Sequence, residues 1–287
     1  MRLGTCLHWE DHFKTSGRFD LDRQLDALAA EGIRGCLFNF PPDESQWEKV
    51  SLELEKALRN AGIILLEFNS PCNLYAPTHD QCRIIAEKYV DALAISQNIG
   101  CLNVAACVEG PDSILPHPYN RSPEAYARLK DICLLIAEGT ARRNIKARLL
   151  LEPVYTTLLW SPLVTARFID EIGSPNVQAH MDVANFYHYD MIFDQAPFIR
   201  DAFTILKDRI HSAHVKDVAP AKSYFPGLVE MGVGEGIMDY RTYLQCLSKM
   251  PEDFPVIIEH MADLNQIVKS YRIIKTIAEE MGISTWR

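Results

Sequence analysis

Several features that assign proteins to particular classes are missing from this sequence. No apolar run approaches the ~18 residues of a membrane-spanning helix. The opening residues, MRLGTCLHWEDH, show no basic and apolar leader. No run of lysine and arginine offsets the net charge of −9, which disfavours nucleic acid as a partner. We therefore expect a cytoplasmic protein that acts on a small molecule, with neither a membrane nor a nucleic acid as partner.

The sequence also lacks the cysteine spacing of disulfide-rich or zinc-finger domains. Its eight cysteines are scattered, without a CxxC pair. We expect free, mostly buried thiols in a reducing compartment.

What the sequence does contain is a regular series of short apolar runs, which are LGTCLHW (3–9), IRGCLFNF (33–40), IILLEFN (63–69), CLNVAAC (101–107), ARLLLE (147–152), VQAHMD (177–182), IHSAHVKD (210–217) and PVIIEHM (255–261). Between them, apolar residues recur at helical spacing, as in Leu21, Leu25 and Leu28. Helix start and stop signals fall between the runs, for example Ser122-Pro123 and Gly62. The pattern predicts a strand followed by a helix, repeated eight times.

This alternation predicts a (β/α)₈ TIM barrel that forms a single domain over residues 1–287. Near-continuous apolar strands are typical of a parallel sheet covered by helices on its outer face, and a barrel of ~250 residues plus loops accounts for the length. An open doubly wound sheet is the alternative, but the first strand-to-helix segment has no GxGxxG loop. The longest non-periodic segments, 107–121 and 218–237, follow predicted strands and could form lids or substrate walls.

Four consecutive predicted strands finish on a side chain able to bind a metal ion. These side chains are Glu152, Asp182, His214 and Glu259. Because the carboxyl ends of barrel strands open on one rim, the four should converge. Singly, each has a structural interpretation, such as a polar strand end or a core histidine. Together they predict one divalent ion, with Mn²⁺ as the first choice and Mg²⁺, Co²⁺ or Zn²⁺ as alternatives. Oxygen-rich ligation with one nitrogen suits Mn²⁺, Mg²⁺ or Co²⁺ and is less typical of structural zinc.

Such a centre suits chemistry next to a carbonyl group. A divalent ion that chelates a carbonyl and an adjacent hydroxyl acidifies the neighbouring C–H and stabilises an enediolate. Glu152 and Glu259 are the predicted catalytic acid and base. The position to which the proton returns, or the loss of a hydroxyl, decides between epimerisation, isomerisation and dehydration. The sequence leaves these outcomes open.

Other polar or aromatic residues near the predicted rim are candidates for substrate binding, namely His188, Lys216, Asn185, His8, Glu67 and Trp160. His180 shares the inward parity of Asp182, which favours a buried role behind the ligands. Asp217 and Asp239 are expected to orient ligands or to close loops. A homo-oligomer is left open, with Tyr243 and Tyr271 taken as exposed aromatic residues on helices.

The chain resembles the xylose-isomerase-like barrels, which include sugar isomerases, ketose 3-epimerases, inosose and dehydroshikimate dehydratases, and AP endonucleases. The resemblance rests on LLEP (150–153), DxxN (182–185), HVKD (214–217), VGEG followed by Asp239 (233–239) and VIIE (256–259). It implies that Glu152, Asp182, His214 and Glu259 are the metal ligands, and that the two glutamates also serve as acid and base.

The chain departs from two branches of that family. The additional histidines of the AP endonucleases are absent, since earlier strands end at Asn69 and around Cys107. Ketose 3-epimerases usually carry a histidine, a glutamate and an arginine where this chain has Asn185, Leu158 and Pro220. We therefore expect a metal-dependent sugar isomerase or epimerase acting on a ketose or keto-polyol. The alternative is a dehydratase of a keto-inositol or related keto-polyol, whereas a nuclease and a non-catalytic sugar-binding barrel are disfavoured.

Overall fold

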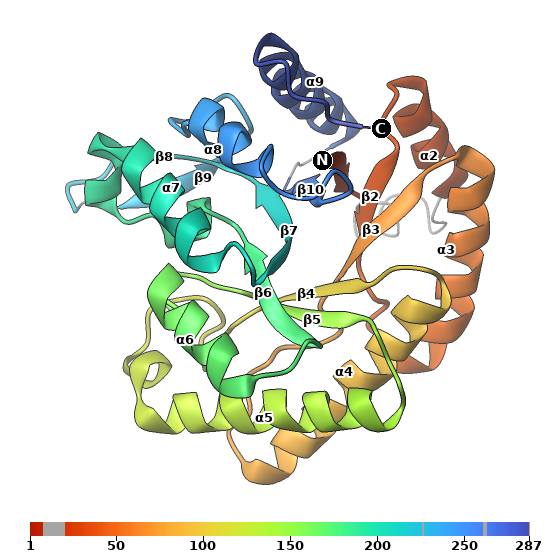
Figure 1. Ribbon diagram of the computed structural model, residues 1–287, viewed down its shortest axis with the longest axis vertical. Coiled ribbons are helices and arrows are strands. Elements are labelled where there is room, and N and C mark those ends of the chain that lie inside the picture. Colours follow the sequence, from red (N-terminus) through yellow and green to blue (C-terminus); the bar gives the residue numbers. More distant parts are fainter. Residues whose placement is uncertain (8–20, 226, 261–262, 287) are drawn as a thin grey trace.

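The computed structural model describes residues 1–7, 21–225, 227–260 and 263–286. Within these residues, eight parallel strands close into a barrel in the order β1-β10-β7-β6-β5-β4-β3-β2, with helices around it (Figure 1). The strands are β1 (Arg2–Cys6), β2 (Gly35–Phe38), β3 (Ile64–Asn69), β4 (Asn103–Cys107), β5 (Arg148–Glu152), β6 (Val177–Met181), β7 (Ile210–Val215) and β10 (Pro255–Ile258). The predicted TIM barrel is confirmed.

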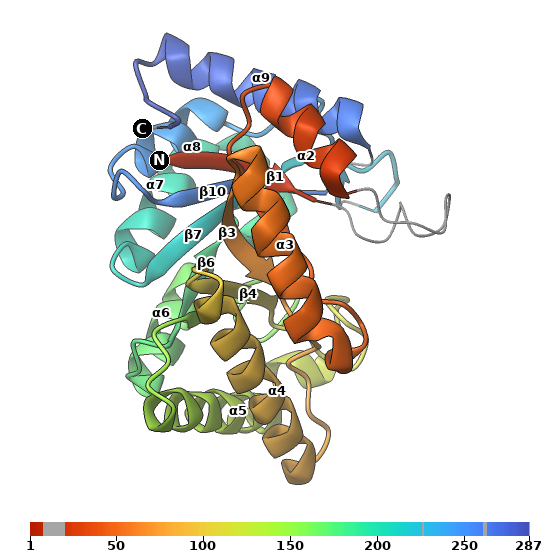
Figure 2. The same cartoon turned by 90° about the vertical axis from the view of Figure 1, so that its right-hand side faces the viewer.

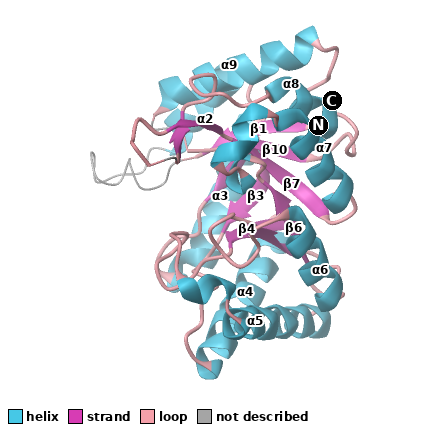
Figure 3. Ribbon diagram, turned by 90° about the vertical axis from the view of Figure 1, so that its left-hand side faces the viewer, coloured by secondary structure: helices cyan, strands magenta, loops and turns pink. Residues whose placement is uncertain are grey.

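The helices form an outer layer around the strands, as the two side views show (Figures 2 and 3). They are α2 (Leu21–Ala30), α3 (Trp47–Ala61), α4 (His79–Asn98), α5 (Pro123–Arg142), α6 (Pro162–Ile172), α7 (Gln195–Leu206), α8 (Tyr240–Leu247) and α9 (Leu264–Glu280). The predicted boundary signals act as expected. The Ser122 side chain accepts a hydrogen bond from the Ala125 N–H at the start of α5, and Gly62 ends α3 in the left-handed conformation.

The strands are buried on both faces, which explains their continuous apolar sequences. Leu149, Leu150 and Leu151 of β5 are all fully buried, so successive side chains pack alternately inside the barrel and against the helices. Each strand pairs in parallel with its neighbours, for example Cys107 of β4 with Glu152 of β5. The carboxyl ends of the strands therefore share one rim of the barrel.

The segment 210–217 is not one strand, as its apolar pattern suggested. β7 ends at Val215, and Asp217 begins β8 (Asp217–Pro220), which pairs antiparallel with β9 (Leu228–Met231) outside the barrel. The cause is the Asp217 carboxylate, which accepts hydrogen bonds from the N–H groups of Val218, Gly234, Gly236 and Met238. Asp217 therefore closes this loop, one of the two roles expected for it.

Two further expectations concern surfaces and thiols. Tyr243 and Tyr271 are buried, so the prediction that they are exposed aromatic residues is wrong; their hydroxyl groups donate to the carbonyl oxygens of His214 and Gly32. All eight cysteines are free and six of them are buried, as expected. No helix in the described part of the chain is long and apolar enough to cross a membrane.

Candidate metal centre

The four predicted ligands come together at the carboxyl-terminal rim of the barrel. Glu152 is the last residue of β5, Asp182 follows β6, His214 lies at the end of β7, and Glu259 follows β10. One ligating atom from each lies within 4.8 Å of the others, and all four side chains are buried. Four neighbouring strands of one sheet thus deliver the cluster.

The donor atoms of this cluster are suited to a divalent ion. Asp182 Oδ2, His214 Nδ1 and Glu259 Oε2 are buried, and they make no hydrogen bond of regular geometry among the described residues; their close contacts are charged ones with Lys216 and with each other. Buried polar atoms are normally hydrogen-bonded, so several that share one space without regular hydrogen bonds are typical of ligands. His214 Nδ1 lies 2.8 Å from Glu259 Oε2 and 3.6 Å from Glu152 Oε1. Three carboxylates and one imidazole match the oxygen-rich ligation of Mn²⁺ or Mg²⁺.

Lys216 and Asn185, which the sequence indicated as substrate-binding residues, lie in the same cluster. The Lys216 ammonium is 3.0 Å from Asp182 Oδ2, 3.0 Å from Glu259 Oε2 and 3.6 Å from Glu152 Oε1. Asn185 Nδ2 donates a 2.7 Å hydrogen bond to Glu152 Oε1. Both residues thus direct N–H groups at carboxylate oxygens of the predicted metal ligands.

The positive groups control the ionisation of the carboxylates. Burial alone would raise the pKa of Glu152, but Lys216 and His214 more than offset it and hold that pKa below its usual value. Burial is likewise offset for Glu259, by His214 and then Lys216, so its pKa is well below normal. For Asp182 burial prevails over Lys216, and the pKa is raised. Glu152 and Glu259 are therefore ionised and able to accept a proton.

Glu67 occupies a different place from the one expected. It is completely buried, and its side-chain contacts are with other residues of the barrel interior. Its Oε1 lies 2.8 Å from His214 Nε2, and its Oε2 accepts a hydrogen bond from the Ser212 hydroxyl. His180 completes this layer, with its ring centroid 4.0 Å from that of His214 and its Nε2 3.5 Å from Glu67 Oε2. The buried role expected of His180 is confirmed.

One pair at the rim was not anticipated from the sequence. His260 follows Glu259, with its Nδ1 2.6 Å from Glu230 Oε1 on β9 and its Nε2 3.4 Å from Glu259 Oε1. Its φ of +57° is strained for a non-glycine residue, as is common at functional sites. Burial lowers the pKa of His260, but the contacts with Glu230 and Glu259 prevail and raise it to about 9. The hairpin β8–β9 is thereby linked to a predicted ligand.

Two of the remaining candidates make their contacts with residues outside the cluster. His188 is 42% exposed and pairs with Asp190, with Nδ1 3.0 Å from Oδ1. The Trp160 ring is covered by the Arg121 guanidinium, whose carbon lies 4.9 Å from the ring centroid. His8 lies outside the described residues. The structure therefore brings Lys216 and Asn185, but neither His188 nor Trp160, into contact with the predicted ligands.

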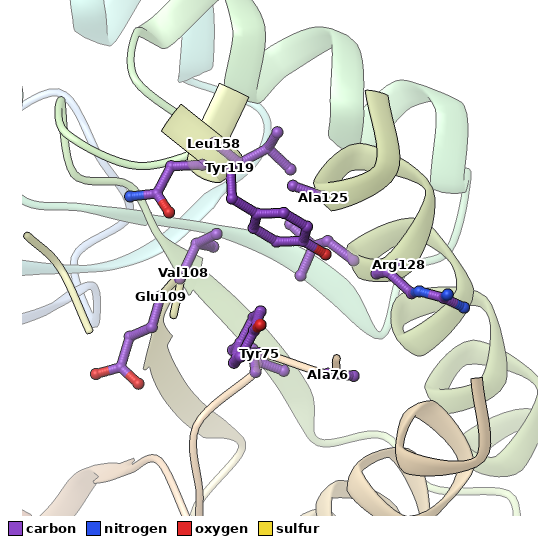
Figure 4. Close-up of a pocket in the computed structure, with 12 residues that line it drawn as sticks. Tyr75, Ala76, Val108, Glu109, Tyr119, Ala125, Arg128 and Leu158 are labelled. Atoms are coloured by element: carbon purple, nitrogen blue, oxygen red, sulfur yellow. The ribbon is translucent and has the colours of Figure 1, made fainter. Parts of the chain in front are cut away.

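A small cavity lies beside the end of β4, where Tyr75 and Tyr119 face each other edge to face with their centroids 5.6 Å apart (Figure 4). Its volume of about 20 Å³ accommodates little more than one water molecule. The Tyr119 hydroxyl and the Arg128 Nε are buried without a hydrogen-bond partner among the described residues. This cavity is too small for a sugar, so it is not the substrate site.

Comparison with known proteins assigns the family. The family model described as "Xylose isomerase-like TIM barrel" matches residues 20–277, and the chain belongs to this family. No curated protein sequence matches the chain.

Solved structures with this fold include a 3-keto-D-glucoside 4-epimerase, YcjR, from E. coli, with a TM-score of 0.71, 14% identity, and coverage of 96% of this chain and 99% of that one. The probable 3-DHS dehydratase AsbF from Bacillus anthracis has a TM-score of 0.70, 14% identity, and coverage of 96% and 99%. A xylose isomerase-like protein from Mycobacterium smegmatis in complex with magnesium has a TM-score of 0.67, 12% identity, and coverage of 90% and 88%. At these identities the similarity establishes the fold.

Proposed function

We propose that this protein is a divalent-metal-dependent isomerase or epimerase that acts on a ketose or keto-polyol. The observation that carries the proposal is the cluster of Glu152, Asp182, His214 and Glu259, in which three buried ligating atoms lack hydrogen-bond partners among the described residues. The epimerase with the same fold acts on a 3-keto-D-glucoside, a substrate with a carbonyl group beside hydroxyl-bearing carbons.

The residues of the cluster have different roles in the proposed reaction. A bound divalent ion would polarise a substrate carbonyl and its neighbouring hydroxyl. Glu152 and Glu259 reach the site from β5 and β10, which lie three positions apart in the barrel, so they approach from different sides. One of the two carboxylates, Glu259 or Glu152, removes the proton beside the carbonyl and becomes a carboxylic acid, and the other returns a proton that it has first taken up from water. The Asn185 amide holds Glu152 Oε1 in place for this step.

Lys216 gives specific support to a second function, the dehydratase. Its ammonium lies within 3.0 Å of both Asp182 and Glu259, so a charged proton donor is present beside the carboxylates. Loss of a β-hydroxyl requires protonation of the departing oxygen, and a positively charged ammonium is suited to that step. The probable dehydratase among the similar structures makes this reaction a natural alternative on the same barrel.

The test begins with metal content. Elemental mass spectrometry of the purified protein should find about one equivalent of Mn, Mg, Co or Zn. The variants Glu152→Gln and His214→Ala should lose it. Glu109→Gln, which removes a half-buried carboxylate outside the cluster, is the matched control and should retain it. A wild-type protein that binds no metal, even after incubation with excess Mn²⁺, would exclude the proposal.

Substrates are then surveyed in D₂O with a panel of ketoses and keto-inositols. Solvent deuterium should enter one of them beside the carbonyl group, because the mechanism breaks and remakes a C–H bond. An epimer or isomer as product supports the favoured reaction. A dehydrated ketone instead supports the dehydratase, and in that case Lys216→Met should slow the release of water more than it slows the exchange of deuterium.

A further inference from the structure

The contact between Glu67 and His214 spans the barrel. Glu67 belongs to β3 and His214 to β7, and these strands are separated by three others in both directions around the closed sheet. The two residues are 147 positions apart in the sequence, yet Oε1 and Nε2 are 2.8 Å apart. Both side chains are completely buried, so the contact is screened from water.

The two ring nitrogens of His214 face different surroundings. Nε2 points down to Glu67, whereas Nδ1 lies near Glu259 and Glu152 and has no hydrogen-bond partner among the described residues. A carboxylate only accepts hydrogen bonds, so the Glu67 contact keeps a hydrogen on Nε2. A ring with its single hydrogen on Nε2 has a lone pair on Nδ1, which is the form that binds a metal ion.

We propose that Glu67 is a positioning residue that holds His214 in the metal-binding tautomer and orientation. This inference rests on the proposed function, since it concerns the same ion. Ser212 donates to the other oxygen of Glu67, so the carboxylate is itself held in place. The His180 ring, 4.0 Å from that of His214, limits rotation of the imidazole. Ser212, Glu67 and His180 thus support the ligand from the side opposite to the ion.

Glu67, His180 and His214 could themselves be taken for a second metal site, because their ligating atoms also lie within 4.8 Å of one another. The hydrogen bonds argue against this interpretation. One oxygen of Glu67 is engaged by His214 Nε2 and the other by Ser212, so neither oxygen is unsatisfied. Apart from His214, whose unsatisfied Nδ1 faces the upper cluster, His180 is the one member of the lower group with unsatisfied atoms among the described residues, its two ring nitrogens. In the upper cluster Asp182, His214 and Glu259 each contribute such an atom, so that cluster offers more ligand atoms to an ion.

The experiment measures Mn²⁺ affinity rather than activity. Wild-type protein, Glu67→Gln and Ser212→Ala are stripped with EDTA, and the dissociation constant for Mn²⁺ is measured by competition with a fluorescent chelator. Loss of a carboxylate that orients a ligating histidine weakens metal binding by about 10- to 100-fold. We expect a loss of that size for Glu67→Gln and a smaller loss in the same direction for Ser212→Ala.

A matched control separates positioning from general destabilisation. Thr5→Val removes a buried polar group from β1 whose hydroxyl donates to the Ile258 carbonyl oxygen. It should lower the melting temperature without changing the Mn²⁺ affinity. The absorption spectrum of bound Co²⁺ should change in Glu67→Gln and stay constant in Thr5→Val, because only the first substitution removes the carboxylate that orients His214.

The outcomes are distinguishable. A wild-type protein that binds no Mn²⁺ refutes the proposed function and this inference with it. A wild-type protein that binds one equivalent, with equal affinity in folded Glu67→Gln, refutes this inference alone. Two equivalents in wild type, of which Glu67→Gln loses one, would make Glu67 a ligand and would also overturn its assignment as a positioning residue.

Discussion

Replacement of Lys216 by methionine is the most direct perturbation of the cluster. The ammonium lies 3.0 Å, 3.0 Å and 3.6 Å from oxygens of Asp182, Glu259 and Glu152, and the side chain is only 7% exposed. Removing one partner of a buried ion pair costs about 3–5 kcal/mol. Each kcal/mol lowers the melting temperature of a protein of this size by roughly 2–4 °C. We therefore expect EDTA-treated Lys216→Met to melt on the order of 10 °C below wild type.

Metal should reverse this loss, because a divalent ion supplies the missing positive charge. In differential scanning calorimetry, excess Mn²⁺ should raise the melting temperature of Lys216→Met by more than that of wild type. Lys130→Met is the control, since Lys130 pairs with Glu171 at 3.0 Å on the surface, where such pairs contribute about 1 kcal/mol or less. Equal melting of wild type and Lys216→Met in EDTA, or an equal effect of Mn²⁺ on both, would refute the reasoning.

Three further predictions concern single groups. Asp217→Asn should lower stability by about 1–3 kcal/mol in urea unfolding, because an amide oxygen cannot replace a carboxylate that accepts four backbone N–H bonds; unchanged stability would contradict this. Glu230→Gln should lower kcat about 10-fold, because it removes a contact that positions His260 beside Glu259. The Mn²⁺ affinity should stay constant, because His260 contacts the Glu259 oxygen that is turned away from His214. An unaltered kcat would show that the contact between Glu230 and His260 does not affect catalysis. Burial, and after it the charge of Arg148, lowers the pKa of His211 from 6.5 to about 4. Between these pH values only the unfolded chain binds a proton at this position, so stability falls as the pH drops through 6.5 and levels off near pH 4. His211→Gln should therefore lose less stability than wild type between pH 8 and pH 5, by about 1 kcal/mol of unfolding free energy after allowance for partial exposure. The same dependence of stability on pH in both proteins would contradict this prediction.

The ligand cluster was predictable because it depends on few assumptions. Apolar runs identify parallel strands, and a closed barrel brings their carboxyl ends to one rim. A charged residue directly after such a run must then face that rim, as Glu152, Asp182 and Glu259 do. The convergence of these side chains follows from the barrel alone, without knowledge of side-chain packing, whereas their role as ligands stays a prediction.

The hairpin β8–β9 was not predictable in the same way. The segment 218–237 has no apolar periodicity, and its strands pair because Asp217 gathers four N–H groups from both ends of the loop. The contact of Glu230 with His260 depends on that pairing and on the left-handed backbone at His260. Such a contact follows from the three-dimensional path of the loop, which local spacing does not encode.

Glu67 shows how depth within the barrel decides the role of a strand-end carboxylate. It lies two residues before the end of β3, level with Leu37 of β2, so its side chain enters the interior below the rim. The interior near the rim thus holds four carboxylates, those of Glu67, Glu152, Asp182 and Glu259, and the ammonium of Lys216. When His214 binds the ion it is neutral, and the set then carries −4 + 1 = −3. A monovalent ion would leave −2 in a buried space, whereas a divalent ion leaves −1, so the charge of both layers together favours a divalent ion.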